Sequence, residues 1–375
     1  MKKILLTSGI VLAVLTLGGL YTYQKAIAPT ASDLPNLIIT KPEEIKVLAT
    51  DLSVPWDIAH LPDGDFLITE RTGTLALIGK EGGVVGRAAV PKVVAVGEGG
   101  LLGIALHPDF SNNNYLYIYR TVSVGSGYQN QVVRFQYHPT DHTLTNEKII
   151  LDNIPAGSVH NGGALSFGPD GYLYITTGDT GNTALAPNLN SLSGKILRIT
   201  AEGEVPSDNS FGNEIYSYGH RNPQGLAWDE TGQLWSVEHG RSGLQSGLDE
   251  LNKIIASGNY GWPDSEGNKV LSDTIGPIEH SGTDDTWAPS GLAYYQNTLY
   301  FTGLRGQKLY QAKMDQENNA VSLQTFFSGE YGRLRAARIF GDTLYITTSN
   351  NDRRGQPDSD DDKLIAVPLE LLVEN

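Results

Sequence analysis

The clearest pattern in the chain is a short phrase that recurs six times. Each copy begins with a small or apolar segment, passes through a turn often written PDG, and enters a strand in which apolar and polar residues alternate. The turn chemistry is that of a hairpin, because Pro presets φ and Gly accepts the positive φ that ends the turn. The copies are IAHLPDGDFLIT from Ile58, IALHPDFSNNNYLYIY from Ile104, LSFGPDGYLYIT from Leu165, LAWDETGQLWSV from Leu226, LAYYQNTLYFT from Leu292 and ARIFGDTLYIT from Ala337.

The spacing of these copies predicts the architecture. Successive starts are separated by 46, 61, 61, 66 and 45 residues, which leaves room for about four short strands per repeat. We therefore predict an all-β fold, a six-bladed β-propeller with four antiparallel strands per blade, over residues 46–375. A β-solenoid would need shorter and more constant periods.

Composition agrees with this prediction and excludes some partners. The chain has 375 residues with 43 glycines and only 18% charged residues, which favours many short strands and tight turns. Its formal net charge of −15 argues against nucleic acid or anionic lipid as a partner, and it makes any cluster of arginines noteworthy. Cysteine is absent, so disulfides and thiolate chemistry are excluded.

The N-terminus has the order of an export segment. Lys2 and Lys3 precede an apolar run from Ile4 to about Tyr23. We expect residues 1–25 to be either a cleaved signal peptide or an N-terminal membrane anchor, and residues 26–45 to be a linker. The folded part is then expected at the periplasmic or extracellular face, with residues 4–23 in the inner membrane if the segment is retained.

The first candidate for chemistry is His160. Loops that enter the innermost strands of a propeller lie near its axis, and the segment VHNGG stands just before one such strand. An imidazole there could act as a general base near neutral pH. The two glycines predict a backbone that comes close to a ligand. The alternative is a histidine that only caps a turn.

Arginines form the second candidate group. Arg333 and Arg335 are two residues apart, so on an extended segment they share a face. Arg221 and Asn222 are adjacent on another inner loop, and Arg305 belongs to the fifth repeat. Four arginines from three repeats predict a polyanionic ligand on the axis, against the alternative of weak surface ion pairs.

A third segment could bind a hard cation. The stretch VEHGRSGLQSGLDELN, residues 237–252, is rich in glycine and ends near Asp249 and Glu250, which offer the oxygen ligands that calcium takes. Residues Asp358 to Asp362 are also acidic, and we expect them to form a solvated turn.

Together these motifs resemble the soluble glucose/sorbosone dehydrogenase family, and within it the bacterial aldose sugar dehydrogenases. The similarity is carried by HNGG followed by FGPDG, LNSLSGKILRIT, GHRNPQG, NYGWP and GRLR, in order from about Lys46 to the C-terminus. The resemblance implies a six-bladed propeller that binds pyrroloquinoline quinone (PQQ) and calcium. It implies oxidation of an aldose at C1 to the lactone, with electrons passed to an external quinone or redox protein.

The resemblance also implies roles for individual residues. His160 would remove the C1 hydroxyl proton while hydride moves to C5 of PQQ, and Arg221 would stabilise charge on the C5 oxygen. The residues implied to lie at the cofactor are Glu98, His160, Arg221, Asn222, Arg305, Arg333 and Arg335. The carbonyls of Gly240 and Arg241 would bind the cofactor's calcium, and Glu250 and Tyr260 a second, structural calcium.

Five positions depart from the family pattern, among them Ala164 and Pro187, and the other three belong to or adjoin the predicted site. Glu98 stands where the glucose enzymes have a glutamine, which adds a negative charge near an anion. Arg241 replaces a frequent proline, although a carbonyl ligand survives any side chain. Val159 replaces an aspartate beside His160, which removes a potential orienting partner.

Two other functions are compatible with the fold. A calcium-dependent lactonase or esterase would want several Asp, Asn and Glu side chains around one metal, whereas these inner loops carry arginines. A propeller that only binds a partner would have no use for His160 together with Arg221 and Asn222.

Overall fold

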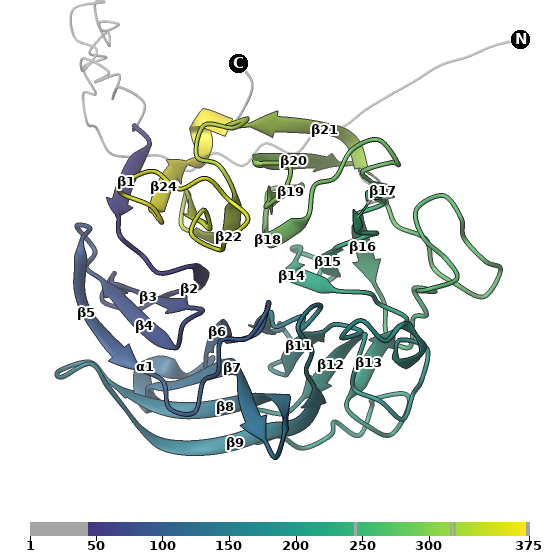
Figure 1. Cartoon of the computed structure of the whole chain (residues 1–375), viewed down its shortest axis with the longest axis horizontal. Coiled ribbons are helices and arrows are strands. Elements are labelled where there is room, and N and C mark those ends of the chain that lie inside the picture. The colour runs from purple at the N-terminus through teal and green to yellow at the C-terminus, as the bar shows by residue number, and fades with distance from the viewer. Residues whose placement is uncertain (1–43, 244–245, 316, 318–319, 373–375) are drawn as a thin grey trace, which may run out of the picture. The chain divides into compact units, whose positions relative to one another are not determined.

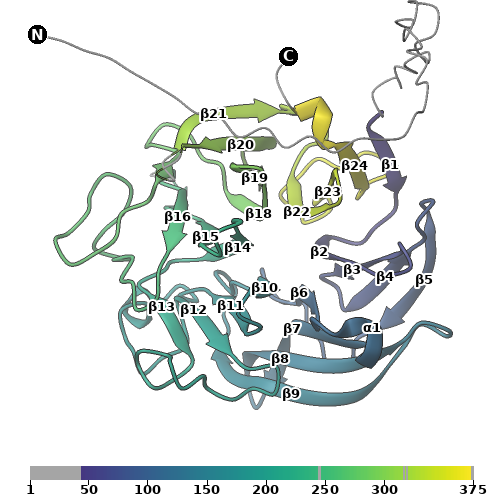
Figure 2. The same ribbon diagram turned by 180° about the vertical axis from the view of Figure 1, so that it is seen from behind.

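The computed structural model describes residues 44–243, 246–315, 317 and 320–372, and these form six four-stranded antiparallel sheets arranged in a ring (Figures 1 and 2). The prediction of a six-bladed β-propeller is confirmed. The predicted export or anchor segment, 1–25, and all of the predicted linker up to residue 43 lie outside the described residues. Among the residues that are described, no helix is long and apolar enough to cross a membrane.

Each sheet runs from an inner to an outer strand. The first contains β2 (Pro55–His60), β3 (Phe66–Glu70), β4 (Thr74–Ile78) and β5 (Val84–Ala89), and the second β6 (Leu101–Leu106), β7 (Tyr115–Val124), β8 (Gly127–His138) and β9 (Thr143–Pro155). The third contains β10 (Leu165–Phe167), β11 (Leu173–Thr177), β12 (Lys195–Ile199) and β13 (Ile215–Tyr218), and the fourth β14 (Pro223–Trp228), β15 (Leu234–Glu238), β16 (Glu250–Ile254) and β17 (Glu279–His280). The fifth contains β18 (Pro289–Tyr295), β19 (Thr298–Gly303), β20 (Lys308–Met314) and β21 (Ala320–Phe326), and the sixth β22 (Leu334–Phe340), β23 (Thr343–Thr348), β24 (Leu364–Pro368) and β1 (Lys46–Ala49). Three short helices, α1 (Phe110–Asn113), η1 (Thr183–Leu185) and η3 (Leu369–Leu372), lie between or after strands.

The six recurring phrases are the two inner strands of each blade. In the third blade, for example, Leu165 pairs with Ile175 and Phe167 with Leu173 across the predicted hairpin. The inner strands also contact their neighbours around the ring. The ring closes because β1, from the start of the described chain, pairs with β24, with Lys46 opposite Ala366.

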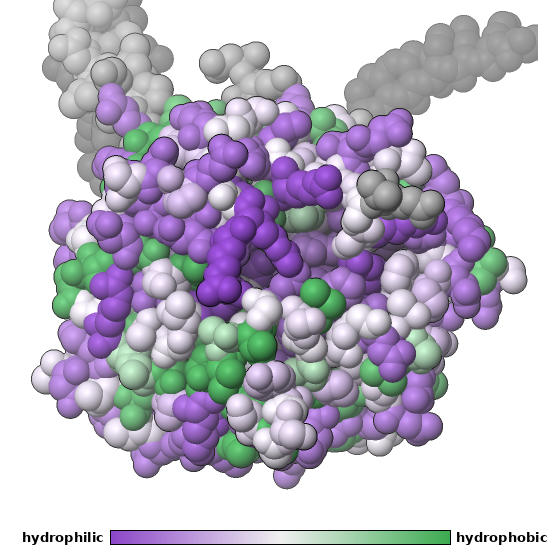
Figure 3. Space-filling view, in the orientation of Figure 1, coloured by the Kyte–Doolittle hydropathy of each residue, from purple (hydrophilic) through white to green (hydrophobic). Residues whose placement is uncertain are grey.

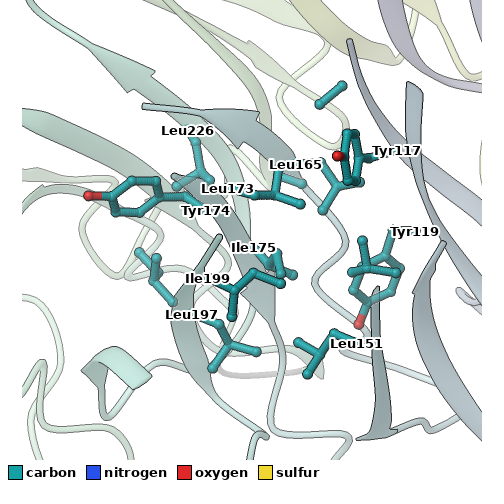
Figure 4. Packing of buried hydrophobic residues seen from close by; sticks show 14 of the residues in the cluster. Tyr117, Tyr119, Leu151, Leu165, Leu173, Tyr174, Ile175, Leu197, Ile199 and Leu226 are labelled. Carbon is teal, nitrogen blue, oxygen red and sulfur yellow. The ribbon is translucent and has the colours of Figure 1, made fainter. Parts of the chain in front are cut away.

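The core lies between adjacent blades rather than inside any one of them. Figure 4 shows apolar side chains of the second blade, including Tyr119 and Leu151, facing Ile175 and Ile199 of the third blade. Both faces of an inner sheet are buried in this way, so the strands read as continuous buried runs; all five residues of β11 are buried.

One prediction about the last acidic stretch is wrong. Asp358 is exposed, but Asp361 is 3% exposed and Asp362 is fully buried. The Asp362 carboxylate accepts hydrogen bonds from the Asn350 amide and from the Thr348 hydroxyl. It is buried because it anchors the loop between β23 and β24, which reaches the site described next.

Candidate active site

His160 lies on the loop between β9 and β10, at a backbone φ of +53°. Its amide donates to Glu98 Oε2 at 2.8 Å, and the carbonyl of the next residue, Asn161, accepts from the Tyr119 hydroxyl at 2.8 Å. One side chain from a loop, Glu98, and one from strand β7, Tyr119, therefore hold the backbone of His160 in a strained conformation, which is typical of functional positions.

Close packing within the protein already requires the two glycines after His160. A Cβ on Gly162 would lie 2.5 Å from the Thr176 carbonyl oxygen, and one on Gly163 would lie 2.7 Å from Cδ1 of Leu102. The loop therefore packs directly against β11 and β6.

A carboxylate absent from our sequence prediction orients the imidazole. His160 Nδ1 lies 2.7 Å from Oδ1 of Asp179, which follows β11 and is 1% exposed, whereas the His160 side chain is 14% exposed. Burial favours the protonated acid, but hydrogen bonds from His160, the Gly181 amide and the Trp262 indole outweigh it and hold the pKa of Asp179 below its ordinary value. Asp179 supplies the orienting partner that Val159 had seemed to remove.

This arrangement fixes which imidazole nitrogen is available. An ionised carboxylate accepts only, so Nδ1 carries the proton and Nε2 has the lone pair. Within the described part of the chain no group hydrogen-bonds to Nε2. The His160 residue lines an open pocket of about 360 Å³, together with Asp179, Thr183, Arg221, Ser242 and Trp262, among others.

Arg221 lines this pocket from the loop before β14, and Asn222 lies next to it on the same loop. Arg221 is 7% exposed, donates to the His239 carbonyl at 3.3 Å and to the Ser242 hydroxyl at 2.9 Å, and lies 5.3 Å from the Trp262 ring. Burial lowers its pKa, with no carboxylate in hydrogen-bond contact with its side chain in the described residues. Asn222 is 1% exposed and accepts the Gly162 amide at 3.1 Å, so it locks the His160 loop to the fourth blade.

Arg333 and Arg335 are both buried, at 7% and 8% exposure, but their surroundings differ. Arg333 pairs with Asp352 at 2.7 Å. Arg335 lies 4.2 Å from the Trp56 ring and donates to the neutral Gln224 at 2.8 Å, and its buried Nε has no partner in the described structure. Burial lowers the pKa of Arg335 to about 9, so the guanidinium remains charged at neutral pH. Of the predicted pair, Arg335 is the member without a carboxylate partner.

The other two predicted cofactor residues are less enclosed. Arg305 is exposed in the turn between β19 and β20, next to Leu304, whose carbonyl accepts from Arg333 Nη1 at 3.1 Å. Glu98 accepts from the His160 amide through one oxygen and from Arg354 through the other, at 2.9 Å. Burial favours the protonated acid of Glu98, but the contacts with His160 and Arg354 outweigh it and lower the pKa. Glu98 is therefore a carboxylate.

The first predicted calcium segment follows β15. The Gly240 amide donates to Asp249 at 2.8 Å, and the Arg241 side chain turns to Glu266 at 2.6 Å. Asp249 also accepts the amides of Trp287 and Ala288, so its buried carboxylate caps backbone groups and is not available as a ligand. Arg241 forms an antiparallel bridge with Gly247, and its amide donates to the Gly247 carbonyl at 2.8 Å.

The second predicted calcium segment contains two buried carboxylates. Glu250 lies opposite Glu238 in the β15–β16 ladder, and both accept from the Asn252 amide group, at 3.1 and 2.9 Å. Burial, and secondly Glu238, raise the pKa of Glu250 to about 8. The Tyr260 hydroxyl is already engaged with the Lys253 carbonyl at 2.6 Å, which leaves that residue only its main-chain oxygen as a ligand. No cluster of three or more His, Cys, Asp or Glu suited to a metal occurs in the described chain.

A second histidine of the site, His239, was not predicted from the sequence. Burial lowers the pKa of His239 to about 3, so it is neutral, and its buried Nε2 has no partner within the described residues. Its Nδ1 lies 3.5 Å from the Asn222 side-chain nitrogen, which donates, so Nε2 carries the proton as an unused donor. The local sequence EHG does not indicate this contact, because Asn222 lies on a different loop, the one before β14.

The fold and site together define a class: a six-bladed propeller with a carboxylate-oriented imidazole and buried, incompletely paired arginines at the ring centre. Figure 3 shows a hollow near the centre of one face of this ring, bordered by strongly hydrophilic side chains. The sequence model of the Glucose / Sorbosone dehydrogenase family matches residues 52–356, and the chain belongs to this family.

Individual relatives agree with this assignment. The PQQ-bound aldose sugar dehydrogenase from Streptomyces coelicolor is 39% identical, with a TM-score of 0.80 over 87% of this chain and 98% of that one. An aldose sugar dehydrogenase of Escherichia coli is 34% identical over 68% of this chain and 74% of its own. Quinoprotein glucose dehydrogenase B of Acinetobacter calcoaceticus is 37% identical over 60% of this chain and 53% of its own.

Proposed function

We propose that this protein is a PQQ- and calcium-dependent aldose dehydrogenase that oxidises C1 of the sugar to the lactone. The observation that carries the proposal is His160, which lines a pocket while its Nδ1 is held 2.7 Å from Asp179, so that Nε2 is the nitrogen left for a ligand. The imidazole accepts the proton of the C1 hydroxyl at Nε2, and the adjacent carboxylate stabilises the resulting cation. As that proton leaves, the C1 hydrogen departs as hydride.

The buried arginines fit a flat, triply acidic cofactor. Arg335 holds a desolvated positive charge with an orphaned Nε, and His239 offers an orphaned Nε2–H; an anion with oxygen acceptors would satisfy both. Asn222, Arg333 and Arg305 complete the set of residues that would hold it. The chemistry that PQQ supplies when bound is an electrophilic quinone carbon, C5, for the hydride. Arg221 would stabilise negative charge on the neighbouring oxygen.

The oxygen atoms of the two predicted calcium segments also fit that cation. Gly240 and Arg241 would offer main-chain carbonyls to the ion that accompanies the cofactor. At the second site, two adjacent buried carboxylates, Glu238 and Glu250, would suit a divalent cation. Burial first, and Glu238 second, raise the pKa of Glu250, and a bound cation would offset both effects. Tyr260 would contribute its carbonyl oxygen there.

The electron acceptor and the location are also part of the proposal. Electrons pass on to an external quinone or redox protein. We place the enzyme at the periplasmic or extracellular face, because residues 1–25 have the order of an export or anchor segment.

Reconstitution tests this function. The purified full-length protein is supplied with PQQ and CaCl₂, and dye reduction is followed with a panel of aldoses. We expect turnover that requires PQQ and falls after chelation of calcium. Turnover without PQQ, or hydrolysis of a lactone in place of dye reduction, would refute the proposal.

A further inference from the structure

Three guanidinium groups that the proposed function does not use lie around Glu98, whose carboxylate accepts the His160 amide. Arg71 follows β3, and Arg353 and Arg354 belong to the loop between β23 and β24; we call these three residues the rim arginines. Arg353 and Arg354 are exposed, in contrast to the buried Arg335. Exposed cations attract negative charge from solution, which matters in a chain with 27 basic and 42 acidic residues.

Two of the rim arginines, Arg354 and Arg71, are linked to the loop that carries His160. Arg354 Nη1 is 2.9 Å from Glu98 Oε1, and the other oxygen of the same carboxylate accepts the His160 amide. Arg71 donates to the carbonyl of Gly97, the residue before Glu98. Gly97 packs directly on the His160 loop, since a Cβ there would lie 2.1 Å from the Ser158 carbonyl oxygen. A single carboxylate thus separates Arg354 from His160.

Two of these charges have no acidic partner. The nearby carboxylates are already engaged, Asp352 by the buried Arg333 and Glu98 by Arg354. In the described part of the chain Arg353 forms no hydrogen bond or ion pair, and Arg71 forms no ion pair. Burial lowers the pKa of Arg71. Asp352 raises this pKa, whereas the neighbouring Arg354 and Arg353 lower it further. Such crowding of like charge is relieved by an anion.

We propose that the rim arginines bind the negatively charged group of an acidic aldose, a carboxylate or a phosphate, while its C1 lies at His160. The inference rests on the proposed function and specifies its substrate class. In a pyranose, C1 and the substituent on C5 lie on opposite sides of the ring oxygen, so a base at one end and a cation at the other select for both groups. Arg353 has all five guanidinium donors free for this contact in the described structure.

The test compares matched substrates. The holoenzyme, with excess calcium removed, is assayed with glucose, glucuronate and glucose 6-phosphate at low and high ionic strength. We expect kcat/KM to be at least about fivefold higher for one or both acidic sugars at low salt, and this preference to shrink at about 0.5 M salt. A preference for only one of them identifies the carboxylate or the phosphate as the natural group.

Arg353→Gln is the diagnostic variant, because changing Arg354 would also disturb Glu98 and His160. It should lower the ratio of kcat/KM for the acidic over the neutral sugar by about tenfold, as expected for one charge-assisted contact. Lys80→Gln is the matched control, since Lys80 is also an exposed cation whose side chain forms no ion pair in the described chain. The control should leave the ratio unchanged.

A binding measurement separates this inference from catalysis. Calorimetry with 1,5-anhydroglucitol 6-phosphate, which has no C1 hydroxyl, should show tighter binding than with 1,5-anhydroglucitol or with inorganic phosphate alone, and Arg353→Gln should remove the difference. If neutral aldoses are oxidised but acidic ones gain nothing and Arg353→Gln has no effect, the inference is wrong and the proposed function stands. If no aldose is oxidised, the proposed function itself fails.

Discussion

Two histidines of this protein make the same bond to a buried carboxylate and are suited to different tasks. His160 Nδ1 lies 2.7 Å from Asp179, and His220 Nδ1 lies 3.2 Å from Glu238. Asp179 and Glu238 are 1% and 5% exposed, respectively. The carboxylate partner alone therefore does not mark a catalytic residue.

The difference lies at the other nitrogen. His220 is fully buried, its Nε2 lies 2.8 Å from the Ser217 hydroxyl, and its ring stacks on Tyr260 at 4.5 Å. His160 borders the pocket, and its Nε2 is free of partners in the described chain. An imidazole with both nitrogens engaged holds the structure together, whereas one with a free Nε2 can take a proton from a ligand.

The largest expected effect comes from replacing the histidine with the free nitrogen. His160→Gln should lower kcat for aldose oxidation at least about a hundredfold, because the general base is lost. Cofactor binding, followed by PQQ absorbance, and the unfolding midpoint should change little. Turnover near the wild-type rate would show that His160 is no more catalytic than His220.

Removing the charge beside that histidine should have the next largest effect. Asp179→Asn should lower kcat roughly tenfold to a hundredfold, because the imidazole loses its fixed tautomer and the charge that stabilises the imidazolium.

Asp229→Asn is the matched control for Asp179→Asn. Asp229 is also buried and also accepts from an indole, that of Trp235 at 3.1 Å, but it contacts no histidine among the described residues. Equal losses of kcat in both variants would contradict a special role for Asp179.

The structural histidine should affect stability instead. His220→Leu removes one hydrogen bond from the buried Glu238 and leaves the buried Ser217 hydroxyl without its histidine partner, which should cost about 1 to 3 kcal/mol of unfolding free energy in urea. The loss in kcat should be far smaller than that of His160→Gln. A variant that unfolds at the wild-type midpoint but loses turnover would reverse the comparison.

The smallest expected effect is on stability and comes from replacing Glu250, which lies opposite Glu238. The pKa of Glu250 is raised from 4.5 to about 8, so between these values the native state binds more protons than the unfolded state. The stabilisation that Glu250 contributes to the calcium-free protein is therefore complete below about pH 4.5, and it is lost as the pH rises through 8.

Glu250→Gln should flatten this decline. Relative to wild type in EDTA, the variant should gain about 1 to 2 kcal/mol between pH 6 and pH 8.5, measured by chemical unfolding. It should also lose stabilisation by added calcium. Parallel pH profiles for the two proteins would disprove the burial argument.

The sequence predicts those features that depend on local pattern. Alternation and turn chemistry predict the inner two strands of all six blades. They also place His160 and Arg221 on loops that enter inner strands and Arg335 at the start of another inner strand, β22. Contacts between blades are not local. Glu98 and Arg354 are 256 positions apart, and nothing in the segment TTGD indicates that Asp179 meets His160 once β9, β10 and β11 are packed. The burial of Asp362 and the exposure of Arg305 likewise depend on how the loops close over the ring.

Anaerobic single turnover tests the central claim most directly. The wild-type enzyme, loaded with PQQ and calcium, is mixed with one equivalent of an aldose, unlabelled or deuterated at C1, and the quinone absorbance is followed. We predict bleaching of the bound quinone that is slower with the deuterated sugar, because the C1–H bond breaks as His160 takes the proton. Absence of bleaching, or equal rates for the two sugars together with undiminished bleaching in His160→Gln, would contradict this account.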